Sequence, residues 1–376
     1  MRLADGGLAL PHRPFALLPR WAAAAVLALL AAAMAWSAWV AAPAPPLPTR
    51  PPATAAAAAP STATPAKRPP PGDLALYSRI HTRMAAGEGY YAAALAEQRA
   101  SGYPTRPFVT VRLPTLAGAQ AVLGPQGVRW LTLALVGAAI LALNWRAVPL
   151  ASLEERIIAS ALLAAGGGAT LSPLAAYDHD YVAGVLLTLA LLAYRPHRWW
   201  PALLAAAAAL AVRELAAPFV LLWLAFALAG KRWREAFALA ALLALFALGL
   251  ALHAQAVAAE RLAGDLASQG WNARAGFGVA LTGLAELTGL RHLPPGLAAP
   301  IAILPLLGWV SLGGRAGLFA ALWFAGLATM MALFARPGNY YWAELALPAY
   351  AIGLAFAPRG LAELAMRLAG RTARQT

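Results

Sequence analysis

Residues able to move protons or hold phosphate are concentrated in four short stretches of this chain. They comprise candidate catalytic acids (Asp73, Asp178, Asp180), candidate phosphate-binding arginines (Arg112, Arg213, Arg336) and candidate substrate contacts (Tyr77, Tyr90, Tyr91, His179, Glu214, Tyr340, Tyr341). A carboxylate can take the proton of an attacking hydroxyl group, and arginine offers paired donors to phosphate oxygens. These residue types predict a site that binds a phosphorylated ligand and activates a hydroxyl group.

The Asp178-His179-Asp180 triplet could also offer ligands to a metal ion. Ligands at i and i+2 with one His and no Cys are a weak metal signal, so we assign no metal site. The sequence requires no cofactor, although a divalent cation is compatible with these acids. Phosphate-loop, nucleophile-elbow and His-Glu-x-x-His motifs are absent from the sequence, which argues against an ATPase, a serine hydrolase or a zinc protease.

The composition indicates that these residues belong to a membrane protein. Of 376 residues, 61% are hydrophobic and 12% are charged, too few charges to cover a soluble protein of this length. The formal net charge is +14, but the cations are spread along the chain rather than clustered, so nucleic acid is not an expected partner. In membrane proteins such an excess of cations usually reflects which loops face the cytoplasm and which residues contact anionic lipids.

Apolar stretches of about 20 residues predict an all-α polytopic protein. The expected spans are 21–42, 128–145, 157–176, 181–194, 199–213, 216–230, 236–256, 296–312, 316–335 and 341–357. The first is too long for a typical secretory signal, which favours an uncleaved anchor. Cytoplasmic tails at 1–20 and 358–376, a Pro/Ala-rich linker at 43–72 and a loop with surface helices at 73–127 complete the predicted organisation around the bundle at 128–357.

The stretch 199–230 can form one span or two, and this choice decides whether the number of membrane crossings is odd or even. Pro218 favours a break, hence two short helices that meet at Arg213 and Glu214. With ten crossings, 15 of the 29 cations fall on the inner side and eight in the long first loop, which is too long to follow the positive-inside rule. Both termini are then cytoplasmic, and the candidate site residues lie on the outer side.

Several of these residues have a structural alternative. Asp73 could be a helix N-cap, and the aromatic residues from Tyr340 could be an interfacial belt. Arg213 and Glu214 are neighbours in sequence, so we expect them not to face each other and to pair with other helices instead. The hairpins that carry these residues are short, however, so their polar ends should lie below the lipid headgroups. Ionisable groups at that depth are energetically costly, which favours a functional role for them.

The first loop resembles that of the GT-C superfamily of membrane glycosyltransferases over residues 73–145. The resemblance rests on Asp73-Leu-Ala-Leu-Tyr77, Gly87-Glu-Gly-Tyr90-Tyr91, Gly102-Tyr-Pro-Thr-Arg106-Pro-Phe and Arg112-Leu-Pro114. It implies a cavity under surface helices, a sugar donor on polyprenyl phosphate and a loop acid as base. By this resemblance Asp73 is the expected catalytic base, and Asp178 and Asp180 are the alternatives.

We therefore expect sugar transfer to an acceptor hydroxyl group at the outer face of a bacterial inner membrane. The expected partners are the lipid-linked sugar donor, a glycan, lipid or protein acceptor, and membrane lipids. Two alternatives remain at this point. The same pocket could belong to a transporter or flippase for a lipid-linked intermediate, or the chain could be a non-catalytic scaffold of the cell envelope.

Overall fold

The computed structural model describes residues 8–41, 72–147 and 150–371, so all of the predicted linker except Gly72 lies outside the described residues. The described residues form helices and connecting turns and no strand, which confirms the all-α prediction. The α-helices are α1 (Arg20–Val40), α2 (Asp73–Ala85), α3 (Tyr90–Ala100), α4 (Thr115–Ala147), α5 (Leu153–Gly167), α6 (His179–Ala193), α7 (Trp200–Val212), α8 (Ala217–Ala229), α9 (Trp233–Ala259), α10 (Gly278–Glu286), α11 (Pro295–Ile301), α12 (Leu304–Leu312), α13 (Gly314–Phe334) and α14 (Ala349–Leu368). Short 3-10 helices are η1 (Pro14–Leu17), η2 (Phe108–Thr110), η3 (Gly168–Leu171), η4 (Pro173–Tyr177), η5 (Glu214–Ala216), η6 (Gly289–His292) and η7 (Pro337–Leu345).

Within the described residues, five helical segments are long and apolar enough to cross a membrane. They are Arg20–Val40, Phe108–Trp145, Trp233–Ala259, Pro295–Leu312 and Gly314–Phe334. A sixth exists if η7 and α14, which meet at 76°, are counted as one broken span. The apolar helices α6, α7 and α8 are shorter. The described part of the chain is thus helical with five or six such segments, fewer than the ten crossings expected from the sequence.

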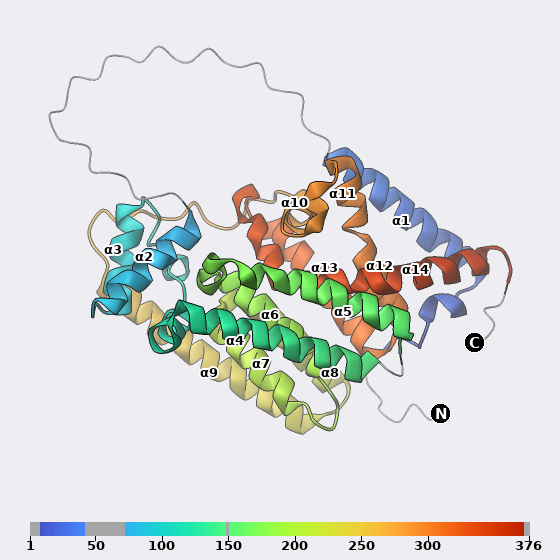
Figure 1. Cartoon of the computed structure of the whole chain (residues 1–376), viewed down its shortest axis with the longest axis horizontal. Helices are drawn as coiled ribbons and strands as arrows, with labels where there is room; N and C mark the ends of the chain where they lie inside the picture. Colours follow the sequence, from blue (N-terminus) through green and yellow to red (C-terminus); the bar gives the residue numbers. More distant parts are fainter. Residues whose placement is uncertain (1–7, 42–71, 148–149, 372–376) are drawn as a thin grey trace, which may run out of the picture.

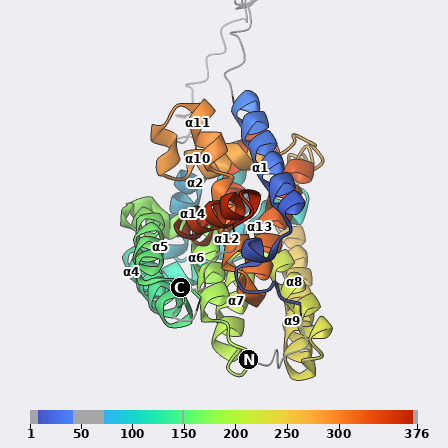
Figure 2. The same ribbon diagram turned by 90° about the vertical axis from the view of Figure 1, so that its right-hand side faces the viewer.

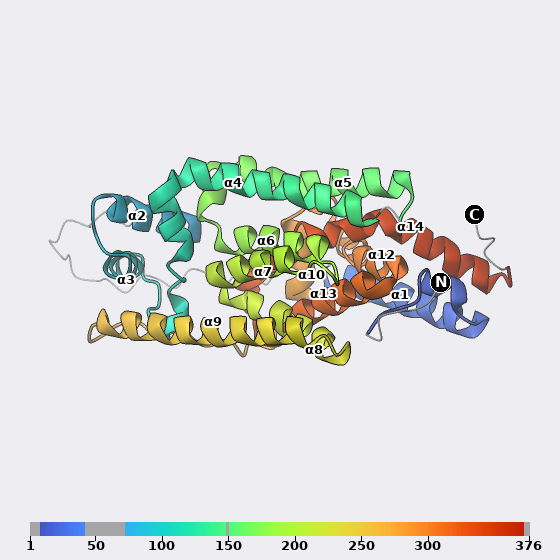
Figure 3. The same ribbon diagram turned by 90° about the horizontal axis from the view of Figure 1, so that it is seen from below.

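The helices pack around α6, whose side chains are almost all buried. Figures 2 and 3 show α6 and α7 between the α4–α5 pair on one side and α8 and α9 on the other. Helices α2 and α3 cover one end of this bundle (Figure 1), which we call the loop face. They have a small core of their own around Leu76, Ile80 and Leu95, to which Val257 of α9 contributes.

The described ends of the chain meet at the opposite end of the bundle, which we call the terminal face. Leu10 pairs with the backbone of Gly314, and Arg13 Nε lies 2.6 Å from Glu363 Oε1. Arg20 Nε donates to the carbonyl oxygen of Leu368 at 2.7 Å. Both described ends therefore lie at one face of the bundle.

Breaks in the helices fall at Gly and Pro. The predicted break at Arg213 is confirmed, since α7 ends at Val212 and α8 begins at Ala217 with Pro218 in its first turn. Gly124 has a φ of 68° and kinks α4 before its apolar part. Helix α5 ends at Gly167, well before the predicted 176, because Gly168 and Pro173 open 3-10 turns. Conversely, α14 continues to Leu368, past the predicted boundary at 357.

Candidate functional site

A cavity of about 670 Å³ opens at the loop face, between the α2–α3 layer and the bundle. Seven residues selected from the sequence line it together: Asp73, Tyr77, Arg112, Arg213, Glu214, Arg336 and Tyr341. The cavity is within the size range of small-molecule sites, which combine apolar walls with a few convergent polar groups. The fold therefore brings residues from four distant stretches into one polar pocket.

The deepest charged group of this pocket is Arg213. Its Nε donates to Asp180 Oδ1 at 2.8 Å, and both side chains are at most 5% exposed. Its Nη1 also contacts Glu214 Oε1. The expectation that Arg213 and Glu214 do not face each other was wrong, because Arg213 has an extended backbone at the helix break instead of a helical one. Buried charges of this kind are stable only as pairs.

Arg112 forms the second positive group and is held mainly by neutral partners. Its Nε donates to the hydroxyl oxygen of Tyr77 at 2.9 Å, and its Nη2 lies 3.5 Å from the hydroxyl oxygen of Tyr341. The nearest carboxylate oxygen, Oδ2 of Asp180, is 3.6 Å from Nη2. Since guanidinium remains charged at physiological pH, Arg112 retains charge that a bound anion could neutralise.

Arg336 closes the far side of the cavity. Its Nε donates to the carbonyl oxygen of Gly270 at 2.9 Å, and its Nη2 donates to that of Gln269 at 2.8 Å. Among the described residues no carboxylate forms an ion pair with Arg336. Its charge is therefore positioned by backbone dipoles and remains uncompensated at the cavity wall.

Asp73 lies opposite, in the first turn of α2. Gly72 occupies the N-cap position, so the alternative role of Asp73 as N-cap is wrong. The hydroxyl group of Tyr103 is hydrogen-bonded to Asp73, and burial together with this bond raises the pKa of Tyr103 to about 12. The phenol therefore stays protonated and donates to Asp73, a half-buried carboxylate that faces the cavity.

The remaining candidates stand behind the cavity wall. Asp178 caps α6 by accepting the Tyr181 amide at 3.0 Å, and its carboxyl group is hydrogen-bonded to that of Glu344. The buried ring of His179 packs against Tyr77, with centroids 4.7 Å apart. These side chains support the site from behind and do not line it.

Tyr90, Tyr91 and Tyr340 are likewise outside the lining. The Tyr90 hydroxyl group donates to the carbonyl oxygen of Arg112 at 2.6 Å, and burial raises the pKa of Tyr90 well above its ordinary value. The Tyr91 hydroxyl oxygen lies 3.2 Å from His253 Nδ1. Tyr340 is 37% exposed beside Tyr341. Of the aromatic cluster on η7, Tyr341 and Trp342 face the cavity.

Sequence reasoning missed Tyr103, Ser268, Trp271 and Asn339 as lining residues. Tyr103 lies inside the Gly102-Tyr-Pro element and could have been selected there. Ser268 and Trp271 belong to a loop with no motif, and they reach the site because Thr105 and Arg106 hydrogen-bond to the backbone of Leu266. In the described part of the chain, no three His, Asp or Glu side chains gather as a metal site.

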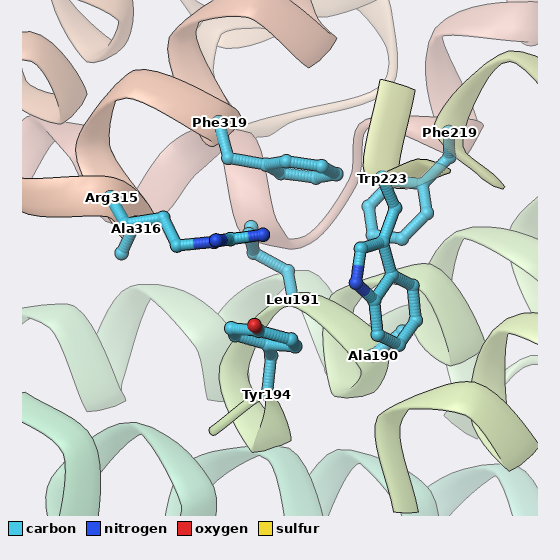
Figure 4. Close-up of a pocket in the computed structure, with 8 residues that line it drawn as sticks. All are labelled: Ala190, Leu191, Tyr194, Phe219, Trp223, Arg315, Ala316 and Phe319. Atoms are coloured by element: carbon cyan, nitrogen blue, oxygen red, sulfur yellow. The ribbon is translucent and has the colours of Figure 1, made fainter. Parts of the chain in front are cut away.

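The bundle is closed on the other side, between α6, α8 and α13. Figure 4 shows Arg315 stacked among Tyr194, Trp223 and Phe319 there, around a cavity of about 20 Å³. Arg315 lies over the Tyr194 and Phe226 rings, at 5.1 and 5.3 Å from their centroids. The buried carboxylate of Glu235 accepts from Trp223 Nε1 and lies 3.2 Å from Arg232 Nε. This space holds about one water molecule, so it admits no substrate.

The candidate site therefore combines three arginines, a carboxylate that faces the cavity and several aromatic rings under a lid of surface helices. The three arginines differ in how their positive charge is compensated. Arg213 is paired with a carboxylate, whereas Arg112 and Arg336 are held mainly by neutral groups. Searches against protein-family models, curated proteins and solved structures find no match to this chain.

Proposed function

We propose that this protein is a membrane glycosyltransferase that moves a sugar from a polyprenyl-phosphate donor to an acceptor hydroxyl group. One observation carries the proposal: Asp73 and three arginines line a single cavity of about 670 Å³ at the loop face. A base and an anion-binding wall are the two elements that this transfer needs. The acceptor class is a glycan, a lipid or a protein.

The proposed reaction uses the carboxylate of Asp73 and the arginines that line the same cavity. Asp73 takes the proton of the acceptor hydroxyl as its oxygen attacks the anomeric carbon. The bond from that carbon to the phosphate oxygen breaks, and the phosphate leaves with the electron pair. Arg112 and Arg336 neutralise the negative charge that grows on the phosphate, because their guanidinium groups lack a full counter-charge. Arg213, already paired with Asp180, orients the site from below.

The aromatic residues fit the sugar or the lipid. Tyr341, Trp271 and Tyr103 line the cavity, and flat apolar faces with polar edges suit a ring that carries hydroxyl groups. Tyr77 fixes Arg112 through its hydroxyl group, while His179 packs behind Tyr77. Asp178 and Asp180 then act as supports, and Asp73 is the base that we propose.

The loop face is, in this proposal, the outer face of a bacterial inner membrane. Two arginines near the terminal face, Arg13 and Arg359, pair with acids of the bundle, and cation-rich loops favour the cytoplasm. The donor would reach the cavity from the outer leaflet.

A transporter or flippase for a lipid-linked intermediate is the rival function. Such a protein needs a path that can open toward both faces. The packing of Arg315, Tyr194 and Glu235 between α6, α8 and α13 disfavours that path, because opening it would leave Glu235, which is 1% exposed, without its partners. A scaffold, in turn, has no need of a cavity in which three arginines and a carboxylate converge.

Transfer of a radiolabelled sugar from a polyprenyl-phosphate donor by the purified full-length chain tests the proposal. The Asp73→Asn variant should lose about 10²- to 10⁴-fold in rate, while Glu260→Gln, an exposed acid at the loop face, should keep full activity. Full activity of Asp73→Asn would remove Asp73 from the mechanism. Movement of the lipid across vesicles without a new glycosidic bond would support the flippase instead.

A further inference from the structure

A second cavity, of about 570 Å³, lies on the other side of η7 from the first. One of its walls is formed by the end of α5 and by η3, the other by α10, η6 and the start of α12, and η7 and α14 form its floor. Most of its lining residues are aliphatic, glycine or proline; the polar side chains are Tyr181, Thr288, Arg291, His292, Glu344 and Tyr350. The proposed sugar transfer does not use this cavity.

The cavity exists because its α5 wall is built from small residues. Ala165, Gly166, Gly168 and Ala169 line this wall. A Cβ atom added at Gly168 or at Gly289, on opposite walls, would meet no other atom within 4 Å. The space is therefore open between the two walls, and side chains do not fill it.

The surroundings of the opening are apolar and exposed. Leu293 and Leu297, which follow the lining residues of η6, are 38% and 57% exposed, and Leu171 at the end of η3 is 70% exposed. These leucines are exposed on a bundle whose apolar helices are long enough to cross a membrane. Contact with lipid hydrocarbon suits such side chains better than contact with water. These surroundings favour an occupant that enters from the bilayer.

The two polar ends of the cavity differ in charge. Arg291 Nε lies 3.4 Å from His292 Nε2, both side chains are exposed, and no carboxylate among the described residues forms an ion pair with Arg291. At the floor, Glu344 is hydrogen-bonded to Asp178. An anionic headgroup is thus attracted to the η6 end and disfavoured at the Glu344 end, which fixes its orientation.

We propose that this second cavity binds one anionic phospholipid, with its phosphate at Arg291 and His292 and an acyl chain between the α5 wall and the wall of α10 and η6. Its volume is in the range of lipid- and drug-sized sites, and its one cationic edge lies where the apolar walls end. The site is independent of the sugar-transfer proposal, since none of its lining residues lines the first cavity.

Native mass spectrometry of the full-length chain in detergent tests this site with dioleoyl phosphatidylglycerol and dioleoyl phosphatidylcholine as probes. The wild type should retain one phosphatidylglycerol in preference to phosphatidylcholine. Arg291→Ala combined with His292→Ala should weaken phosphatidylglycerol binding about five-fold or more, from about 1 kcal/mol per lost cation, and phosphatidylcholine binding less, because choline offsets the charge of its phosphate. Arg261→Ala, which removes an exposed cation outside this cavity, is the matched control.

Filling the cavity separates this lipid from lipids on the outside of the bundle. Gly168 has a helical φ of −60°, so Gly168→Phe is compatible with the backbone and should abolish retention of the lipid. Gly137→Phe, at an exposed position of α4 with no atom near its Cβ, should leave it unchanged. If Gly168→Phe fails to fold, Gly289→Leu fills the same space from the opposite wall.

Three results would overturn the proposal: equal retention of the two probes by the wild type, full retention by the cavity-filling variants, or preferential capture of a polyprenyl phosphate at this cavity. Asp73→Asn should bind phosphatidylglycerol as the wild type does. A failure of sugar transfer and a failure of lipid binding can therefore be told apart.

Discussion

Arg213 and Asp180 form a buried ion pair that joins the break after α7 to the first turn of α6, with Nε and Oδ1 2.8 Å apart. The pair fixes where the short hairpin ends and places a positive charge at the base of the polar cavity. Arg112 approaches the second oxygen of the same carboxylate at 3.6 Å. One aspartate thus connects the bundle to the loop that covers it.

Removing one partner of this pair should be strongly destabilising. In Arg213→Met, Asp180 keeps its buried charge without its main counter-charge, which costs about 3–5 kcal/mol. Thermal unfolding in detergent, followed by tryptophan fluorescence, measures the loss. The double variant Arg213→Met with Asp180→Leu should recover most of it, and a double variant no more stable than Arg213→Met alone would show that the two residues are not coupled.

The two ends of α9 should be accessible from opposite sides of the membrane. The chain has no cysteine, so single cysteines can be introduced without background. Lys231→Cys and Arg261→Cys replace exposed residues just before and just after this 27-residue helix. In intact bacterial cells made permeable only at the outer membrane, an impermeant maleimide should label position 261, and position 231 only after lysis. The reverse pattern would invert the proposed orientation.

Gly184 allows η7 to lie directly against α6. A Cβ atom at this position would overlap the carbonyl oxygens of Glu344 and Leu347. Gly184→Ala should therefore displace η7 and lower stability by about 1–3 kcal/mol, seen as a lower unfolding midpoint. Gly137→Ala, with open space at its Cβ, should be neutral or slightly stabilising because alanine favours helix. Equal midpoints for the two variants would contradict the close approach.

The stability of the loop face should depend on pH through Asp265. Arg99 donates to both oxygens of this carboxylate, at 2.7 and 3.1 Å, and these hydrogen bonds hold the pKa of Asp265 well below its usual range. A lowered folded-state pKa stabilises the fold above the unfolded-state pKa of about 4. That contribution is lost as the pH falls below about 4.

Asp265→Asn should accordingly be less stable than the wild type at pH 7, by about 1–3 kcal/mol for the lost charged hydrogen bonds. The difference should shrink as the pH falls below about 4. Hydrogen exchange of residues 262–270 at the two pH values measures it locally. A difference that is constant over this range would show that Asp265 does not act through its charge.

The positions of the helices and of their breaks could largely be predicted from the sequence because they depend on local signals. Pro218 marks the break between α7 and α8, since proline lacks the amide for a helical hydrogen bond. Apolar length located most of the long helices. The early end of α5 was missed because its apolar residues continue beyond Gly167, whereas glycines and Pro173 decide the local backbone.

The site was predictable in its residue types but not in its contacts. The sequence places Asp73, Arg112, Arg213 and Arg336 on one side, and all four line the cavity. The pairing of Arg99 with Asp265 spans 166 positions, and no local pattern encodes it. The second cavity is likewise a product of packing, since it depends on small residues of α5 that face η6 across a gap.

The segment η7 is a common partition between the two cavities. Tyr341 and Trp342 face the first cavity, whereas Glu344 and Leu347, at the end of η7 and just after it, face the second. A shift of this wall toward one space enlarges the other, so the two volumes cannot be set separately. Binding that moves η7 would change the affinity of each cavity by the same factor, and the lipid composition around the protein would then be a variable in its affinity for the donor.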